Sequence, residues 1–320
     1  MNLEIEECKK DEDWDNFLIE SNYKTIFAFS DYISSDYKKI KKFFCKQGRF
    51  IKAGFILNIS NKDIILNENL IYTPIIYRSY QNTSVSRINR EKFFINKHIC
   101  NFIVNNFNKI EIVFDHNTND IRPFIWYDFP EYKKQFIIQI KYTLLLNLKT
   151  LDNNEFEKTT LFKNFSETNR KEYRRSKKLN YSIHENFSKN IFLELTMQTF
   201  EKQNMAYDKI LYESIFNNLY SLYKKNLIKM YILKNKINEV CNFLICSEIR
   251  SDSIFLFFGK NYKIADSEYS SVYFYCELFK ILNKKNITNV DLEGMNSPLR
   301  SFNKLGFGGK LKPYYFLKRF

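Results

Sequence analysis

Glycine and proline are scarce in this chain, which has seven glycines and five prolines among its 320 residues. Because flexible linkers depend on glycine-rich stretches, this composition argues against a low-complexity linker between folded parts. Hydrophobic residues make up 44% of the chain and aromatic residues 18%, which supplies ample core material. The length allows two domains of ordinary size.

Long apolar runs are missing as well. No stretch approaches the ~18 residues that a bilayer-spanning helix needs. The first residues, MNLEIEECKKDEDWD, are acidic where a secretory signal peptide would be basic and then apolar. We therefore expect a cytoplasmic protein, at most peripheral to the inner face of the membrane.

Histidine is rare, and the cysteines follow no metal-binding spacing. The three histidines lie far apart, and the six cysteines include no C-x-x-C pair, so we expect neither a metal site nor a histidine-based triad. We interpret the cysteines as reduced core thiols. The odd offset between Cys241 and Cys246 predicts that they lie on opposite faces of one strand.

Positive charge is in excess, with 50 Lys and Arg against 36 Asp and Glu, a net charge of +14. Such a balance favours a polyanionic partner: the phosphates of a nucleotide, a cofactor, a tRNA or a lipid head group. An AT-rich genome would also raise the lysine content, so part of the excess has a compositional explanation.

Much of this charge is concentrated in RKEYRRSKK, residues 170–178. On a helix these residues form two adjacent stripes at i, i+4 and i+7: Arg170, Arg174 and Lys177, then Lys171, Arg175 and Lys178. Like charges at this spacing repel each other, and arginine suits bidentate phosphate contacts, so the stripes are consistent with an anion site. The alternative is a solvated basic face, eased by Glu167 and Glu172.

Hydrophobic patterning predicts strand, helix and strand twice along the chain, which indicates an α/β (α+β) protein of two domains, 1–135 and 136–320. The first part has strands at 48–59, 63–77 and 109–115 and a helix at 91–107. The second has helices at 190–202, 212–225 and 267–283 and strands at 142–148, 228–233, 240–249 and 253–258.

Residues 291–315 contain the clearest candidates for catalytic residues. A short strand ends in Asp291 and Glu293, and after a turn a helix is N-capped by Ser297, has Pro298 at its first position and is stopped by Gly308 and Gly309. Two residues apart on a strand, the two carboxylates would project from one face and could share an amine, one orienting it and one accepting its proton. The alternative is that one of them caps the helix or pairs with Arg300.

This order of strand, acidic turn, short helix, glycine pair and a strand with Pro313 and Tyr314 resembles the C-terminal end of Fem-type transferases. These are the FemABX-like branch of the GNAT acyltransferase superfamily. The resemblance extends to YTLLLNL at 142–148 and to FEKQNMAYD at 200–208, where Lys202 replaces the usual arginine. Over 1–141 it rests only on the segments IRPFIWYD and TPIIY.

The resemblance implies tandem GNAT-like domains with mixed central sheets flanked by helices, the first domain degenerate. It implies an N-acyltransferase or aminoacyltransferase that forms an amide on a nucleotide- or lipid-linked cell-envelope precursor, either a peptidoglycan stem peptide or an amino sugar. The donor would be aminoacyl-tRNA or acyl-CoA, with no cofactor bound permanently. The catalytic candidates are Asp291 and Glu293, and the substrate-binding candidates are Arg170, Arg174, Lys177, Lys202, Asn296, Arg300, Lys304 and Tyr314.

The sequence departs from a CoA-binding enzyme at one loop. A typical GNAT enzyme holds the CoA pyrophosphate with a glycine-rich loop at a helix N-terminus, but GKNYKIADSEYS has only Gly259. The donor therefore stays open, as does the choice between monomer and homodimer. The alternative function is a non-catalytic RNA- or tRNA-binding protein built on a decayed transferase fold.

Overall fold

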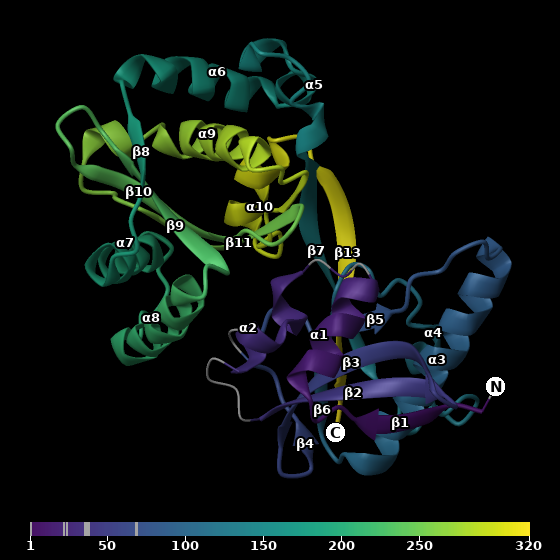
Figure 1. The fold of residues 1–320 in the computed structure, drawn as a ribbon. Coiled ribbons are helices and arrows are strands. Elements are labelled where there is room, and N and C mark those ends of the chain that lie inside the picture. Colours follow the sequence, from purple (N-terminus) through teal and green to yellow (C-terminus); the bar gives the residue numbers. More distant parts are fainter. Residues whose placement is uncertain (1, 22, 24, 35–38, 68–69) are drawn as a thin grey trace. The chain divides into compact units, whose positions relative to one another are not determined.

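The computed structural model describes residues 2–21, 23, 25–34, 39–67 and 70–320, which form two compact units (Figure 1). The first unit is Met1–Lys141 together with Pro313–Phe320, and the second is Tyr142–Lys312. The sequence-based expectation placed the domain boundary at 135/136, and the second unit begins at Tyr142. The end of the chain differs from the expectation, because Tyr315–Arg319 pair with Ile110–Phe114 of the first unit.

The first unit has a mixed sheet with the strand order β1-β2-β3-β4-β6-β13, and β5 pairs with β3. Helix α3 packs on one face, while Trp14 and Phe17 of α1 lie against Gly54 of β3 on the other. Its elements are β1 (Glu4–Glu7), α1 (Asp11–Glu20), α2 (Ser30–Ser34), β2 (Ile40–Gln47), β3 (Phe50–Ser60), β4 (Asp63–Ile64), β5 (Ile75–Tyr77), α3 (Val85–Asn106), β6 (Ile110–Phe114), α4 (Arg122–Ile125) and β13 (Lys310–Arg319).

The second unit has a mixed sheet with the order β7-β12-β11-β10-β9-β8. Helices α6 and α9 cover one face, and α7 and α8 cover the other (Figure 1). Its elements are β7 (Ile137–Asn147), α5 (Thr160–Lys163), α6 (Glu167–Ser176), β8 (Ser182–Glu185), α7 (Lys189–Lys202), α8 (Lys209–Lys224), β9 (Ile228–Lys234), β10 (Val240–Ser247), β11 (Asp252–Lys260), α9 (Ser270–Lys284), β12 (Asn289–Asp291) and α10 (Pro298–Leu305).

The two sheets share one pattern of strand directions. Three antiparallel pairings are followed by one parallel and one antiparallel pairing, from β1 to β13 in the first unit and from β8 to β7 in the second. The helix before the second strand of each parallel pair is α3 in one unit and α9 in the other. This repetition confirms the predicted tandem arrangement of mixed sheets flanked by helices.

Each unit has its own hydrophobic core. In the first, α3 contributes Ile95, Ile99 and Ile103 at helical spacing. In the second, α9 contributes Phe274, Leu278, Phe279 and Leu282, as its nearly all-round apolar sequence predicts. No helix within the described part of the chain has both the length and the apolarity to cross a membrane.

All six cysteines are free and buried, as expected of core thiols. The prediction for Cys241 and Cys246 is wrong, because both belong to the same core cluster of the second unit. The register between β10 and β9 shifts between Val240 and Asn242, so the extra residue cancels the alternation on which the prediction was based.

Candidate functional site

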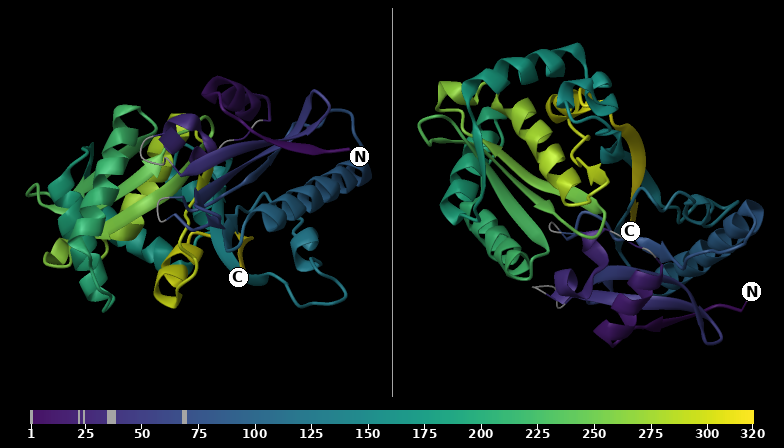
Figure 2. Two further views of the ribbon diagram at one scale, coloured as in Figure 1. Left: turned by 90° about the horizontal axis from the view of Figure 1, so that it is seen from below. Right: turned by 45° about the horizontal axis from the view of Figure 1, so that its top comes forward.

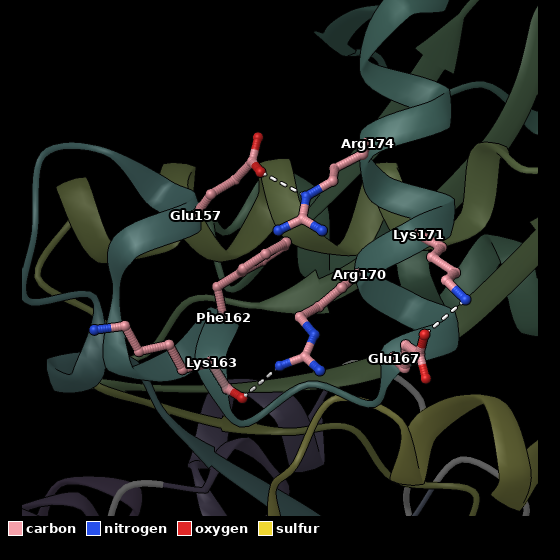
Figure 3. Close-up of a pocket in the computed structure, with 7 residues that line it drawn as sticks. All are labelled: Glu157, Phe162, Lys163, Glu167, Arg170, Lys171 and Arg174. Carbon is pink, nitrogen blue, oxygen red and sulfur yellow. Dashed lines mark hydrogen bonds and ion pairs between the residues drawn. The ribbon is translucent and has the colours of Figure 1, made fainter.

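Most of the predicted site residues of the second unit lie in two polar clusters. The first, here called the α6 pocket, is a cavity of about 350 Å³ lined by Glu157, Phe162, Lys163, Glu167, Arg170, Lys171 and Arg174 (Figure 3). The second, here called the β12 turn, comprises residues 291–296 and the side chains that hold them. Each cluster is built from local sequence signals and from contacts that join distant parts of the chain.

The α6 pocket lies where two short helical segments meet. Thr159 caps α5 by accepting a hydrogen bond from the amide of Phe162 (3.1 Å), and Ser166 caps α6 by accepting one from Asn169 (3.2 Å). The phenyl ring of Phe162 forms an apolar wall beneath the Arg174 guanidinium, which lies 5.6 Å from the ring centroid. These caps fix the direction in which α6 presents its basic face.

Cations outnumber carboxylates among the lining residues. Lys163, Arg170, Lys171 and Arg174 face two acids, Glu157 and Glu167. Lys171 pairs with Glu167 at 2.6 Å, and an Arg170 guanidinium nitrogen donates to the carbonyl of Lys163 at 3.1 Å (Figure 3). The pocket therefore keeps a positive excess after its internal pairs are formed, which is the property that an anion site needs.

Glu157 is the internal partner of the predicted basic stripe. Arg174 Nε donates to its carboxylate at 2.8 Å, and Lys177 Nζ donates at 3.2 Å. The hydrogen bond from Arg174 is the main reason that the pKa of Glu157 is lowered. Glu157 thus occupies the position toward which two predicted phosphate ligands point.

Residues of both predicted stripes line the pocket, because Lys171 of the second stripe lies there with Arg170 and Arg174 of the first. Arg170 and Arg174 line the pocket, and Lys177, in the 3-10 turn after α6, reaches it through Glu157. The Arg175 guanidinium instead stacks on Tyr269, 3.8 Å from the ring centroid. Lys202 is the exposed last residue of α7 and is not among the lining residues.

In the β12 turn, Asp291 is the last residue of its strand and is buried. Its Oδ1 accepts hydrogen bonds from the Thr143 hydroxyl and from the backbone amide of Glu293, the latter at 2.8 Å. The expectation that Asp291 and Glu293 project from one strand face is wrong. The strand has ended before Glu293, which has a φ of 50°, and Gly294 follows with a φ of 62°.

Lys304 and Asn296 hold this turn through its backbone. Lys304 Nζ donates to the carbonyls of Leu292 (2.7 Å) and Glu293 (2.8 Å). The Asn296 amide accepts from the backbone N–H of Tyr142 (2.8 Å) and donates to its carbonyl (3.2 Å), as a neighbouring strand would. Both predicted substrate-binding residues therefore have a structural role here.

The remaining predictions near this turn have separate outcomes. Ser297 occupies the N-cap position of α10, but its side chain makes no capping hydrogen bond. The Arg300 side chain lies outside the described residues. Tyr314 belongs to the first unit, where its ring packs 5.2 Å from that of Tyr72.

The β12 turn lies where the parallel strands β11 and β12 separate. β11 pairs with β12 only from Asp252 to Ile254, opposite Asn289 to Asp291, and then continues to Lys260. Beyond Ile254, none of the described strands pairs with this edge of β11. A bulge opposite Ile245 and Cys246 lies at the same level, and β11 changes from buried to half-buried there. Bulges and strand ends of this kind re-aim side chains next to active sites.

The end of β11 and the loop after it differ from a glycine-rich pyrophosphate loop. Three amides of this segment have side-chain acceptors: Lys260 donates to Thr199 (3.2 Å), Tyr262 to Gln198 (2.9 Å) and Lys263 to Asn261 (3.0 Å). Asp266 and Glu268 add carboxylates just before α9. A Cβ on Gly259 would lie 2.2 Å from Phe243, so packing accounts for this glycine.

A short joint, residues 306–309, connects the two clusters. The Ser166 amide that precedes α6 donates to the carbonyl of Gly306 at 2.8 Å. Gly308 has a φ of 68°, and a Cβ there would lie 2.3 Å from the carbonyl oxygen of Asn164, next to α5. Phe307 is buried, with its ring 5.2 Å from that of Phe165. The chain leaving α10 is thus packed against the segments that form the α6 pocket.

Sequence reasoning missed three residues on which these clusters depend. Thr143 lies 148 positions from Asp291, and Glu157 lies 17 positions from Arg174, so no local pattern marks either pair. Phe162 is one of many phenylalanines. Among the described residues, no three His, Cys, Asp or Glu side chains gather as metal ligands would.

Comparison with known proteins identifies the fold. No protein-family model matches the sequence, and no curated protein sequence matches it. Among solved structures, FemX matches with a TM-score of 0.62 and 12% identity over 99% of this chain and 97% of its own. L-PGS from Bacillus licheniformis matches with a TM-score of 0.55 and 13% identity over 97% of this chain and 92% of its own.

A tandem GNAT protein from the clavulanic acid biosynthesis pathway matches with a TM-score of 0.51 and 9% identity, over 100% of this chain and 98% of its own. At these identities the likeness establishes the fold. The chain has a Fem-like tandem GNAT fold, which confirms the expectation drawn from residues 142–320.

Proposed function

We propose that this protein is an acyltransferase that forms an amide by moving an aminoacyl group onto a primary amine of a phosphate-bearing cell-envelope precursor. The observation that carries the proposal is the position of the β12 turn. It lies at the point where β11 and β12 separate, in the unit that also holds the cationic α6 pocket. The fold shared with FemX and L-PGS supports the same reaction class.

Glu293 is the proposed general base, and Asp291 is a positioning residue. Asp291 accepts the Glu293 amide, so it fixes the backbone from which the Glu293 side chain extends. In the reaction the acceptor amine attacks the donor carbonyl, its proton passes to the Glu293 carboxylate, and the C–O bond of the donor ester breaks. The departing ester oxygen then takes this proton back from Glu293, so the step ends with the base regenerated and the proton on the released hydroxyl.

The α6 pocket is proposed to bind the phosphates of the acceptor. Arg170 and Arg174 offer guanidinium groups suited to phosphate, and Lys177 adds a point charge. The acceptor class is a nucleotide- or lipid-linked precursor, with a peptidoglycan stem peptide ahead of an amino sugar. Aminoacyl-tRNA is the favoured donor over acyl-CoA, because the amides of residues 260–263 already have acceptors.

The test is an assay of the purified chain with a nucleotide-linked stem-peptide precursor and either a mixed aminoacyl-tRNA pool or acyl-CoA. Mass spectrometry should detect an acceptor heavier by one aminoacyl group only with the tRNA pool. Glu293→Gln should lower turnover by ~10²-fold, the usual scale for loss of a general base, with little change in melting temperature. Glu201→Gln, an exposed carboxylate on α7, is the matched control.

Unchanged turnover in Glu293→Gln would remove this residue from the mechanism. Product formation from acyl-CoA would overturn the choice of donor. Tight tRNA binding without product from any donor and acceptor pair would instead favour the non-catalytic RNA-binding alternative.

A further inference from the structure

The first unit exposes a group of aromatic side chains that its own core does not use. They are Phe94, Trp126, Phe129 and Tyr132, from α3 and the loop after α4. Together with the half-buried Phe93 and the exposed Ile125 we call them the aromatic patch. Trp126 is 50% exposed, Phe129 64% and Tyr132 51%. Large apolar side chains gathered on a surface in this way mark an interaction site more often than isolated ones do.

The loop that carries the patch is held in one shape by its own hydrogen bonds. Asp128 accepts the amides of Lys133 (2.9 Å) and Lys134 (2.8 Å) through one carboxylate oxygen, and its carbonyl accepts the amide of Tyr132 (2.8 Å). Arg319 Nε donates to the carbonyl of Lys134 at 3.0 Å. The loop following α4 projects from the body of its unit (Figure 2), so its rings are presented on a fixed support.

Cations surround these rings. The Arg122 guanidinium lies 5.1 Å from the Phe93 centroid and 5.7 Å from that of Trp126, and Arg90 lies 5.8 Å from Phe94. Arg87 and Lys97 share the exposed face of α3 with Arg90 and Phe94, since these positions are three or four residues apart.

The nearby carboxylates are largely engaged inside the unit. Asp120 receives two hydrogen bonds of 2.7 Å from Arg122, and Asp128 accepts the loop amides. Glu91, also on α3, is buried and lies 3.3 Å from Lys52. Glu131 is the exposed carboxylate of the loop. The face that the patch offers to a partner is therefore apolar in its middle and positive along α3.

We infer that the aromatic patch binds the surface of an anionic lipid bilayer, with Trp126 and Phe129 entering the interface and the α3 cations meeting lipid phosphates. Aromatic residues with one apolar and one polar side prefer this boundary, and basic side chains beside them gain from anionic head groups. Single-stranded nucleic acid fits less well, because bases stack on open ring faces and a guanidinium group already lies over one face of Phe93, Phe94 and Trp126.

The chain contains two tryptophans, which makes the inference directly measurable. Trp14 is fully buried with its indole N–H bonded to the carbonyl of Ala28 at 2.7 Å, so Trp126 alone should respond to a surface partner. Vesicles of phosphatidylglycerol with brominated acyl chains should quench Trp126 emission and carry the protein in a flotation assay. Phosphatidylcholine vesicles should do so at least about tenfold less well, because the α3 cations find no net negative charge there.

Trp126→Ala combined with Phe129→Ala should lower partitioning about tenfold or more, and Arg90→Glu with Lys97→Glu should reduce it at low salt. Ile210→Ala with Ile237→Ala is the matched control, since these exposed apolar residues lie in the second unit. Trp126→Phe should still float but lose the quenching.

Absence of both flotation and quenching would overturn the inference. So would quenching of Trp126 by a single-stranded RNA oligonucleotide that displaces the vesicles. A concentration-dependent shift of Trp126 emission with dimers in sedimentation, and no vesicle binding, would assign the patch to a second copy of the chain.

Discussion

The α6 pocket and the β12 turn differ in how their polar groups are used. In the turn, residues that suggest catalysis by type and spacing are engaged with the backbone: Lys304 bonds two carbonyls and Asn296 pairs with Tyr142. In the pocket, residues that also suited a plain solvated face surround a cavity with an excess of positive charge. Residue type therefore indicates chemistry only after the local hydrogen bonds have been assigned.

The largest loss of stability is expected from a substitution at the joint between these clusters. Gly308→Ala should destabilise the protein by about 2–5 kcal/mol, because alanine is strained at a φ of 68° and its Cβ would lie 2.3 Å from the Asn164 carbonyl oxygen. Thermal unfolding followed by circular dichroism measures this loss.

Gly48→Ala is the matched control, since Gly48 has a φ of 55° but no neighbouring atom lies within 4 Å of the place that a Cβ would take. It should cost only the conformational strain of about 1–2 kcal/mol. Equal losses in the two variants would mean that the joint is not tightly packed.

In the α6 pocket, Arg170→Gln together with Arg174→Gln should weaken pyrophosphate binding at least tenfold, because each arginine offers charge-assisted hydrogen bonds worth ~1.5–3 kcal/mol. Titration calorimetry at low salt measures the affinity. Lys178→Gln removes a neighbouring charge that does not line the pocket and should leave the affinity nearly unchanged. If all three substitutions lower the pyrophosphate affinity equally, the ligand responds only to the net positive charge of this region and not to specific contacts in the pocket.

In the β12 turn, Thr143→Val should lower stability by about 1–3 kcal/mol, since it removes the hydroxyl that donates to the buried Asp291 carboxylate. The melting temperature should fall by several degrees. Thr143→Ser keeps the hydroxyl and should recover most of the loss. A stable Thr143→Val protein would show that Asp291 does not depend on this bond.

The smallest effect is expected from Glu157→Gln, which should raise pyrophosphate affinity about two- to fivefold by releasing Arg174 and Lys177. Because the pKa of Glu157 is lowered in the folded protein, its pairing stabilises the fold above its ordinary pKa. That contribution is lost as the pH falls through the lowered value.

Glu155→Gln is the control for this substitution, because Glu155 pairs with Lys158 at 2.7 Å and does not line the pocket. Unaltered affinity in Glu157→Gln would mean that the ligand does not use the position that this carboxylate holds.

The sequence predicted the regular elements best where hydrophobic spacing is clear. The strands β9 to β11 and the helices α7 to α9 lie near their expected positions. Strand β1, with the sequence EIEE, and helix α1, with a charged first turn, offer weak periodicity and were missed. Local patterns thus sufficed for most of the second unit.

What the sequence could not predict depends on contacts between distant residues. The return of β13 to the first unit follows from its pairing with β6, about 200 positions away, and this moves Tyr314 out of the expected site. The face of Glu293 was mispredicted because β12 ends two residues earlier than the alternating pattern suggested. Strand ends and pairing partners are tertiary properties that single-sequence patterns do not contain.

The joint at 306–309 also couples ligand binding at the α6 pocket to ligand binding at the β12 turn. An anion that orders α6 would hold the Ser166 amide against Gly306, and a substrate at the β12 turn would hold α10, which leads into the same glycine. We therefore expect the two ligands to bind with positive cooperativity. Because such coupling is reciprocal, each would raise the affinity for the other by the same factor, and the enzyme would favour a fully loaded state.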